Sequence, residues 1–165
     1  MKKIIGILTV FLVGVGFYVA APSGDKVILP APSTTGLLNP DVTQATIGQT
    51  ICQRGWTSTI RPPATYTSHL KASQLVGTYS YYSDKIPSDY EEDHLISLEL
   101  GGSPTSPANL WPEPYAGKYG ARVKDQLENK LKRLICSGRI SLTEAQQAIS
   151  SNWYSAYLKY VKGMK

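Results

Sequence analysis

The stretch Glu91-Glu92-Asp93-His94-Leu95-Ile96-Ser97-Leu98-Glu99-Leu100-Gly101-Gly102, followed by Asn109-Leu110-Trp111-Pro112, decides the fold expected of this 165-residue chain. It places one of the protein's two histidines directly after an acidic triplet, in a chain with a formal net charge of +5. Residues 93–100 predict a strand, and Gly101-Gly102 predicts a turn. Together with the segment that begins at Asn109, they predict a long hairpin.

The strongest helix signal follows this hairpin, from about residue 119 to residue 136. Its apolar residues recur at a spacing of 3.6 and form one stripe, made of Val123, Leu127, Leu131, Leu134 and Ile135. Residues 118–139 carry seven basic side chains against two acidic ones. We expect Arg122, Lys124 and Lys132 to contact phosphates beside a site on the hairpin. The alternative is a solvated helix face with Glu128 and Lys132 paired one turn apart.

The remaining segments predict a mostly helical frame. Asp41 can cap a short helix reaching about Cys52, Trp56–Ile60 alternates like a short strand, and 66–76 has a helical pattern. Ser141-Leu142-Thr143-Glu144 is a capping box, which predicts a final core-packing helix that buries Trp153.

The N-terminal segment predicts export. Met1-Lys2-Lys3 precedes an uncharged, apolar run from Ile4 to Ala21, as in a signal peptide or a membrane anchor. We expect residues 1–21 to contact the membrane during export, residues 22–38 to form a Pro/Ser-rich linker, and residues 39–165 to form one domain. The protein would then be periplasmic or extracellular, with or without a membrane anchor. Without residues 1–21 the net charge is +3, which is weak support for a polyanionic partner.

Two cysteines, Cys52 and Cys136, are 84 residues apart. Because an exported chain meets oxidising conditions, they predict a single disulfide. Two buried thiols, or half of a zinc site, are the alternatives. Zinc is disfavoured because the chain has no Cys-x-x-Cys, and neither histidine lies at ligand spacing from a cysteine.

The hairpin and the helix together can supply what phosphodiester hydrolysis requires. A histidine titrates near neutral pH and can take a proton from water, and a divalent cation can neutralise charge on the phosphate. A carboxylate can hold that cation. Asp93 and His94 are adjacent, so on a regular strand they point to opposite faces. Both can serve one site only if the strand twists or bulges there.

The Asp93-His94…Gly101-Gly102…Asn109-Leu110 pattern resembles the HNH endonucleases of the ββα-metal fold. The wider frame over residues 39–157 resembles small exported bacterial HNH-type proteins. The resemblance implies an α+β fold with a ββα-metal hairpin-plus-helix core and additional N-terminal and C-terminal helices. It also implies that His94 is the general base, that Asp93 is a metal ligand, and that Asn109 pins the hairpin and orients the histidine.

The chain departs from the family pattern on the helix, which carries no histidine. The remaining candidates for the helix ligand are Asp125 and Glu128, with Asn129 third. Because these ligands are mainly carboxylates, Mg²⁺ or Mn²⁺ is the expected cofactor.

We therefore expect an exported, metal-dependent endonuclease that acts on DNA or RNA with little sequence specificity. The alternatives are a non-catalytic exported nucleic-acid-binding protein on a degenerate HNH fold, and a hydrolase of another phosphodiester. The sequence gives no sign of a protein partner.

Overall fold

The computed structural model describes residues 27–164, so the predicted export segment lies outside the described residues. Within them the chain has an α+β fold. The elements follow in the order α1 (Trp56–Ile60), α2 (Ala64–Val76), β1 (Tyr90–His94), β2 (Leu110–Pro114), α3 (Ala121–Cys136) and α4 (Leu142–Tyr160). Short 3₁₀ turns, η1 (Pro87–Asp89) and η2 (Leu98–Leu100), flank β1.

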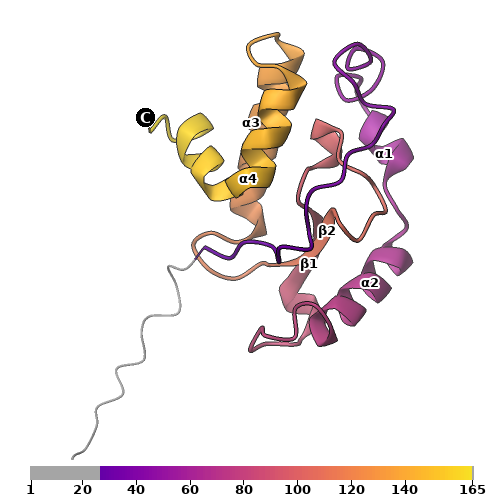
Figure 1. Cartoon of the computed structure of the whole chain (residues 1–165), viewed down its shortest axis with the longest axis vertical. Coiled ribbons are helices and arrows are strands. Elements are labelled where there is room, and N and C mark those ends of the chain that lie inside the picture. Colours follow the sequence, from indigo (N-terminus) through magenta and orange to yellow (C-terminus); the bar gives the residue numbers. More distant parts are fainter. Residues whose placement is uncertain (1–26, 165) are drawn as a thin grey trace, which may run out of the picture.

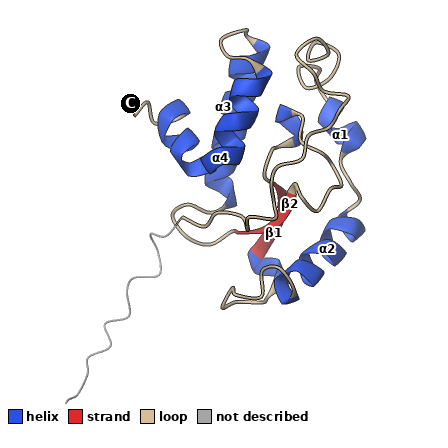
Figure 2. Cartoon of the chain, viewed as in Figure 1, coloured by secondary structure: helices blue, strands red, loops and turns tan. Residues whose placement is uncertain are grey.

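The two-stranded sheet lies between two groups of helices. Helix α2 packs along both strands on one side, while α3 and α4 pack against each other on the other side (Figure 1). Figure 2 shows how little of the chain is strand and how much is loop around this ribbon. The sheet therefore depends on the helices and loops around it, since an isolated two-stranded ribbon is only marginally stable in water.

The predicted hairpin is present, although its first strand is displaced toward the N-terminus. Strands β1 and β2 are antiparallel, with Asp93 opposite Trp111 and His94 opposite Leu110. The strand predicted over residues 93–100 ends at His94, and Leu98–Leu100 forms the turn η2 instead. The strand ends here because the Asn109 side chain hydrogen-bonds to both the backbone N–H and the carbonyl of Ile96. These two groups are therefore not available to pair with the second strand.

The predicted helices after the hairpin are confirmed as α3 and α4. The Leu127, Leu131 and Ile135 side chains of α3 are buried against α4, where Trp153 is fully buried. Helix α4 begins as the capping box predicts, because the Ser141 hydroxyl accepts a hydrogen bond from the backbone N–H of Glu144. This helix pair supplies most of the larger of the two core clusters, and packing against α4 holds α3 in place beside the hairpin.

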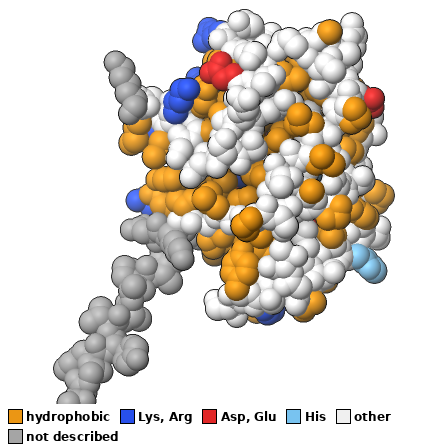
Figure 3. Space-filling model, viewed as in Figure 1, with side chains coloured by type: hydrophobic (Ala, Val, Ile, Leu, Met, Phe, Trp, Pro, Cys, Tyr) orange, Lys and Arg blue, Asp and Glu red, His pale blue; other side chains and the backbone are white. Residues whose placement is uncertain are grey.

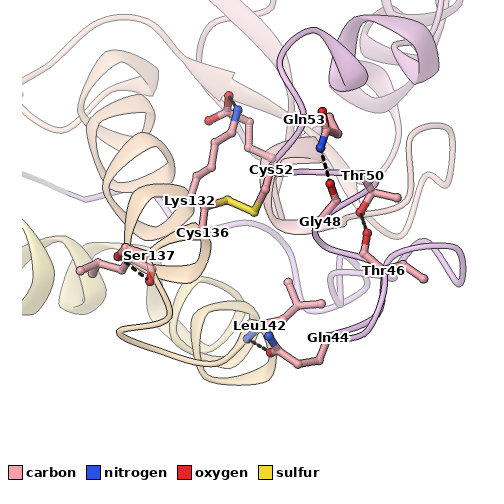
Figure 4. Close-up of a disulfide and its surroundings, with 12 residues drawn as sticks. Gln44, Thr46, Gly48, Thr50, Cys52, Gln53, Lys132, Cys136, Ser137 and Leu142 are labelled. Atoms are coloured by element: carbon pink, nitrogen blue, oxygen red, sulfur yellow. Dashed lines mark hydrogen bonds and ion pairs between the residues drawn. A yellow bond between two sulfur atoms is a disulfide. The ribbon is translucent and has the colours of Figure 1, made fainter.

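The predicted disulfide between Cys52 and Cys136 is also present. It joins the end of α3 to the loop that precedes α1, as Figure 4 shows. On the same face Gln44 accepts a hydrogen bond from the backbone N–H of Leu142, at the start of α4. The N-terminal loops are thus tied to both C-terminal helices.

The prediction of a strand at Trp56–Ile60 is wrong, since these residues form helix α1. Gly55 has a positive φ of 84° and turns the chain away from an extended path. The hydroxyls of Ser58 and Thr59 then donate to the carbonyls of Gly55 and Trp56, which favours a local turn over a sheet.

The helix predicted from Asp41 to Cys52 is also wrong, because this segment is a series of turns. Asn39, rather than Asp41, makes the first cap contact, accepting from the backbone N–H of Asp41. The Thr46 hydroxyl then binds the carbonyl of Asp41 and the N–H of Thr43. Such side-chain bonds compete with helical ones, which explains the irregular path.

Residues 27–38, which belong to the predicted linker, form no helix or strand but contain a turn at 32–33 and a bridge from Leu38 to Gly102, and they pack against the rest of the described chain. Ala31 and Thr34 are buried, and both bind the Tyr79 hydroxyl.

Among the described residues, no helix is both long and apolar enough to cross a membrane. On the face shown in Figure 3, charged side chains are sparse and hydrophobic ones are frequent. The acidic residues of β1 form no exposed acidic patch, since Glu91, Glu92 and Asp93 are all partly buried.

Candidate functional site

Asn109 fixes the loop that connects the two strands. The side chain is fully buried, and its amide nitrogen donates to the carbonyls of Ile96 (3.0 Å) and Ser103 (2.9 Å). Its amide oxygen accepts from the N–H of Ile96 at 2.9 Å. Gly102 makes this close approach feasible, because a Cβ atom there would lie 2.6 Å from the Asn109 amide nitrogen. One amide thus joins both ends of the loop.

His94 lies at the end of β1 and is held by this same loop. Its Nε2 lies 2.9 Å from the carbonyl oxygen of Pro104, next to the residue that Asn109 binds. A carbonyl only accepts, so Nε2 carries the proton and Nδ1 is the nitrogen left to accept one. Burial, with smaller effects from Lys124 and Arg61, lowers the pKa of His94, so the neutral ring is favoured at pH 7. A neutral ring in this tautomer can accept a proton at Nδ1.

A cleft of about 330 Å³ opens at His94, between β1 and helix α2 with the residues Arg61 and Pro62 that precede it. Arg61 and Lys71 bring two positive charges to its lining, which also contains Tyr115 and the two glutamates Glu91 and Glu92. Burial raises the pKa of both glutamates. The Lys71 ammonium also donates to the carbonyl of Tyr90 at 2.6 Å, which fixes it against β1. A cleft that combines a neutral histidine with an arginine and a lysine can accommodate an anionic group such as a phosphate.

Asp93 points to different neighbours from His94, as alternation along a strand requires. Its Oδ2 lies 2.5 Å from the Nζ of Lys124 on α3. The same Nζ lies 2.5 Å from Oε1 of Glu128 and 2.7 Å from the carbonyl oxygen of His94. The Lys124 side chain is completely buried. The centre of this group is therefore an ammonium ion surrounded by three oxygen atoms.

The charged groups around Lys124 change one another's pKa values. Burial alone lowers the pKa of Lys124, but the surrounding carboxylates outweigh it and the net pKa is raised. Burial likewise favours protonated Asp93, yet Lys124 and hydrogen bonding hold the pKa of Asp93 below its usual value. Glu113 is 1% exposed, and burial raises its pKa well above the ordinary value, so its neutral form is favoured. Burial also raises the pKa of Glu128 to about 7, against the pull of Lys124.

The residues around Asp93 do not leave room for the predicted divalent ion between Asp93 and a helix carboxylate. Carboxylate and carbonyl oxygens are suitable ligands for Mg²⁺ or Mn²⁺. However, the point at which Asp93 and Glu128 converge is taken by the Lys124 ammonium. Both carboxylates could hold an ion there only if Lys124 moved away.

The other predicted residues are dispersed along α3. Asp125 is partly exposed and pairs with Arg122 at 3.4 Å, while Asn129 is exposed and donates to the carbonyl of Asp125. Arg122 is largely exposed, and its guanidinium lies 5.6 Å from the ring centre of Tyr115, at the edge of the cleft. Arg122 thus remains a candidate phosphate contact.

The other two predicted phosphate contacts are placed differently. Lys124 is fully buried, because Asp93 and Glu128 hold its ammonium in the interior. Lys132 pairs with Glu99 at 2.8 Å, near the disulfide and not on the cleft (Figure 4). The alternative pairing of Lys132 with Glu128 is replaced by this contact, since Glu128 binds Lys124.

Three features of the site were missed in the sequence. Arg61 and Lys71 were not singled out, because only folding brings α1 and α2 to the histidine. The local sequence does show that Arg61 precedes Pro62-Pro63, and this proline pair separates α1 from α2. Glu113 follows the Trp-Pro pair of the second strand, and nothing in its local sequence signals burial. Comparison with protein-family models, curated proteins and solved structures gives no match to this chain.

Proposed function

We propose that this protein is an exported endonuclease that hydrolyses phosphodiester bonds of DNA or RNA with His94 as the general base. The observation that carries the proposal is the state of His94 in its cleft. Nε2 is bound to the Pro104 carbonyl, the lowered pKa favours the neutral ring, and Arg61 and Lys71 both line the cleft. These are the requirements for deprotonating a water molecule beside a bound phosphate.

The contacts of each residue in the cleft suggest its role in the proposed hydrolysis. Arg61 and Lys71 would bind the phosphate oxygens and raise the local concentration of a polyanion, with Arg122 extending the positive surface along the cleft edge. His94 Nδ1 would take the proton from the attacking water as its oxygen bonds to phosphorus. The P–O bond to the departing sugar oxygen would break, and that oxygen would take a proton from solvent. Asn109 would act through the loop, by keeping the Pro104 carbonyl in position. Contacts of this kind are made to the backbone of the nucleic acid, so little sequence specificity is expected.

We also propose that β1, β2 and α3 form a ββα unit of the HNH type. The order of the three elements and the contact of Lys124 on α3 with Asp93 and His94 on β1 support this proposal. The Cys52–Cys136 disulfide is compatible with the proposed export. A requirement for Mg²⁺ or Mn²⁺ stays a prediction.

The proposal is tested with the purified full-length protein on a panel of substrates: supercoiled plasmid, single-stranded DNA, RNA and a non-nucleic phosphodiester. Each reaction is run with Mg²⁺, with Mn²⁺ and with EDTA. We expect cleavage of at least one nucleic acid, lost in His94→Ala and retained in His69→Ala, which changes the other, exposed histidine on α2. Intact nucleic acid under all three conditions would refute the proposal, whereas cleavage of the non-nucleic substrate alone would favour a different phosphodiesterase.

A specific observation favours a second candidate, a non-catalytic nucleic-acid-binding protein. The buried ammonium of Lys124 stands between the two carboxylates that were expected to hold the catalytic cation. In that case the cleft would still bind polyanions through Arg61 and Lys71. Salt-sensitive binding of DNA or RNA, weakened in the Arg61→Ala/Lys71→Ala variant and without any turnover, would identify this function.

A further inference from the structure

The buried lysine of α3 has a more specific role than a structural ion pair. We propose that the ammonium group of Lys124 is the resident cation of this site and takes the place of a divalent metal between Asp93 and Glu128. The inference rests on the proposed function only in treating Asp93 as part of a hydrolytic site. It predicts that the Asp93–Glu128 pair of the natural protein does not bind metal.

The hydrogen-bond count supports this assignment. A lysine ammonium has three donors and no acceptor. All three are matched by oxygen atoms within 2.7 Å: Asp93 Oδ2, Glu128 Oε1 and the carbonyl oxygen of His94. No donor remains for a substrate, and the side chain has no exposed surface. Lys124 is therefore a positioning residue, which joins α3 to the side chain of Asp93 and to the backbone of His94.

The charges lead to the same conclusion. Asp93 and Glu128 approach one point in the interior, so a cation is needed there to offset them. Lysine provides a compact charge of the right sign on a stem long enough to reach from α3 to β1. A divalent ion bound to the same two oxygens would lie only a few ångströms from this ammonium, without water between them. Repulsion of this kind is strong in a buried environment.

The pair formed by Lys132 and Glu99, two turns further along α3, is a natural control. It joins one ammonium to one carboxylate at 2.8 Å, and the side chains are 29% and 25% exposed. It has neither the second carboxylate nor the backbone carbonyl that surround Lys124. Removal of Lys132 therefore leaves no cradle of oxygen atoms for an ion.

The first test measures binding of Mn²⁺ to the full-length protein by calorimetry, with wild type and Glu128→Gln side by side. We expect the two titrations to be the same, because Glu128 is already occupied by Lys124. One Mn²⁺ bound by wild type with at least tenfold weaker binding in Glu128→Gln would overturn the proposal. This comparison does not require a lysine variant to fold.

The second test compares the melting temperature in EDTA with that in Mn²⁺. In Lys124→Ala the carboxylates lose their cation, so we expect Mn²⁺ to raise the melting temperature of this variant. The gain should disappear in Lys124→Ala/Glu128→Gln and be absent in wild type and in Lys132→Ala. A gain in wild type that Glu128→Gln removes, or no gain in folded Lys124→Ala, would contradict the proposal. Neither test uses nuclease activity, so failure of the proposed function and failure of this inference are distinguishable.

Discussion

At the scale of single residues, the adjacent side chains of Asp93 and His94 on β1 contact different parts of the protein. His94 faces the cleft and the Pro104 carbonyl, whereas Asp93 reaches Lys124 on α3. The sequence shows that such neighbours should diverge, and the structure adds the partner of each. Lys124 joins the two again, because its ammonium binds the side chain of Asp93 and the backbone carbonyl of His94.

Glu92 gives a residue-scale prediction about pH. Burial, only partly offset by Lys71, raises the pKa of Glu92 to about 8, above its ordinary value of 4.5. The folded protein therefore holds this proton more tightly than the unfolded chain. Its contribution to stability is complete below about pH 4.5 and is lost as the pH rises through about 8. Allowing for partial solvent access, the loss should be about 3 kcal/mol.

Urea denaturation in EDTA from pH 4 to pH 9 measures this effect. We expect Glu92→Gln to gain stability over wild type as the pH rises, because glutamine carries no proton to lose. Asp41→Asn, which removes an exposed carboxylate far from β1 in the sequence, is the control for loss of one carboxylate at the surface. A difference between Glu92→Gln and wild type that is the same at pH 5 and pH 9 would contradict the assignment.

At the scale of elements, the loop between the strands has more influence on the site than the strands themselves. Residues 95–109 fold back so that Asn109 binds both Ile96 and Ser103, and the Pro104 carbonyl meets His94. The sequence pattern identified Asn109 and the Gly-Gly turn, but it extended the first strand too far. The sequence pattern of a strand does not reveal that a side chain, here Asn109, binds the backbone in place of the neighbouring strand. The end of β1 could therefore not be predicted.

Gly102 should be the most sensitive position in this loop. A Cβ atom there would lie 1.7 Å from the carbonyl oxygen of Ile96, which is backbone and cannot rotate away. We expect Gly102→Ala to lower the free energy of unfolding by at least about 2 kcal/mol, measured by urea denaturation. Gly48→Ala is the matched control, since a Cβ there meets nothing within 4 Å. Equal denaturation midpoints for the two variants would show that the loop is not as closely packed as described.

At the scale of the whole molecule, long-range contacts hold the hairpin between α2 and the α3–α4 pair. Periodicity predicted α3 and α4, because a buried stripe at a spacing of 3.6 is a strong signal. It did not predict the cleft, since Arg61 and Lys71 precede His94 by 33 and 23 residues and meet it only after folding. The burial of Lys124 was missed for the same reason: a lysine on a basic helix resembles a solvent-exposed lysine until its partners on β1 are known.

The disulfide gives the corresponding whole-molecule prediction. It closes a loop across 84 residues and links the N-terminal turns to the end of α3. Its loss should cost about 4 kcal/mol through the greater entropy of the unfolded chain. We expect Cys52→Ala/Cys136→Ala to show this loss in urea denaturation and to be insensitive to reductant, whereas wild type loses stability when reduced. Reduced and oxidised wild type with the same midpoint would contradict the prediction.

The most direct test of the central claim is the initial rate at which purified protein converts supercoiled plasmid into nicked circles at pH 7. The measurement compares wild type with His94→Ala under the ion condition that gives the highest wild-type rate. If His94 is the general base, the variant should be slower by a factor of about 100 or more, while its melting temperature stays close to that of wild type. Equal nicking rates in the two proteins would contradict the account.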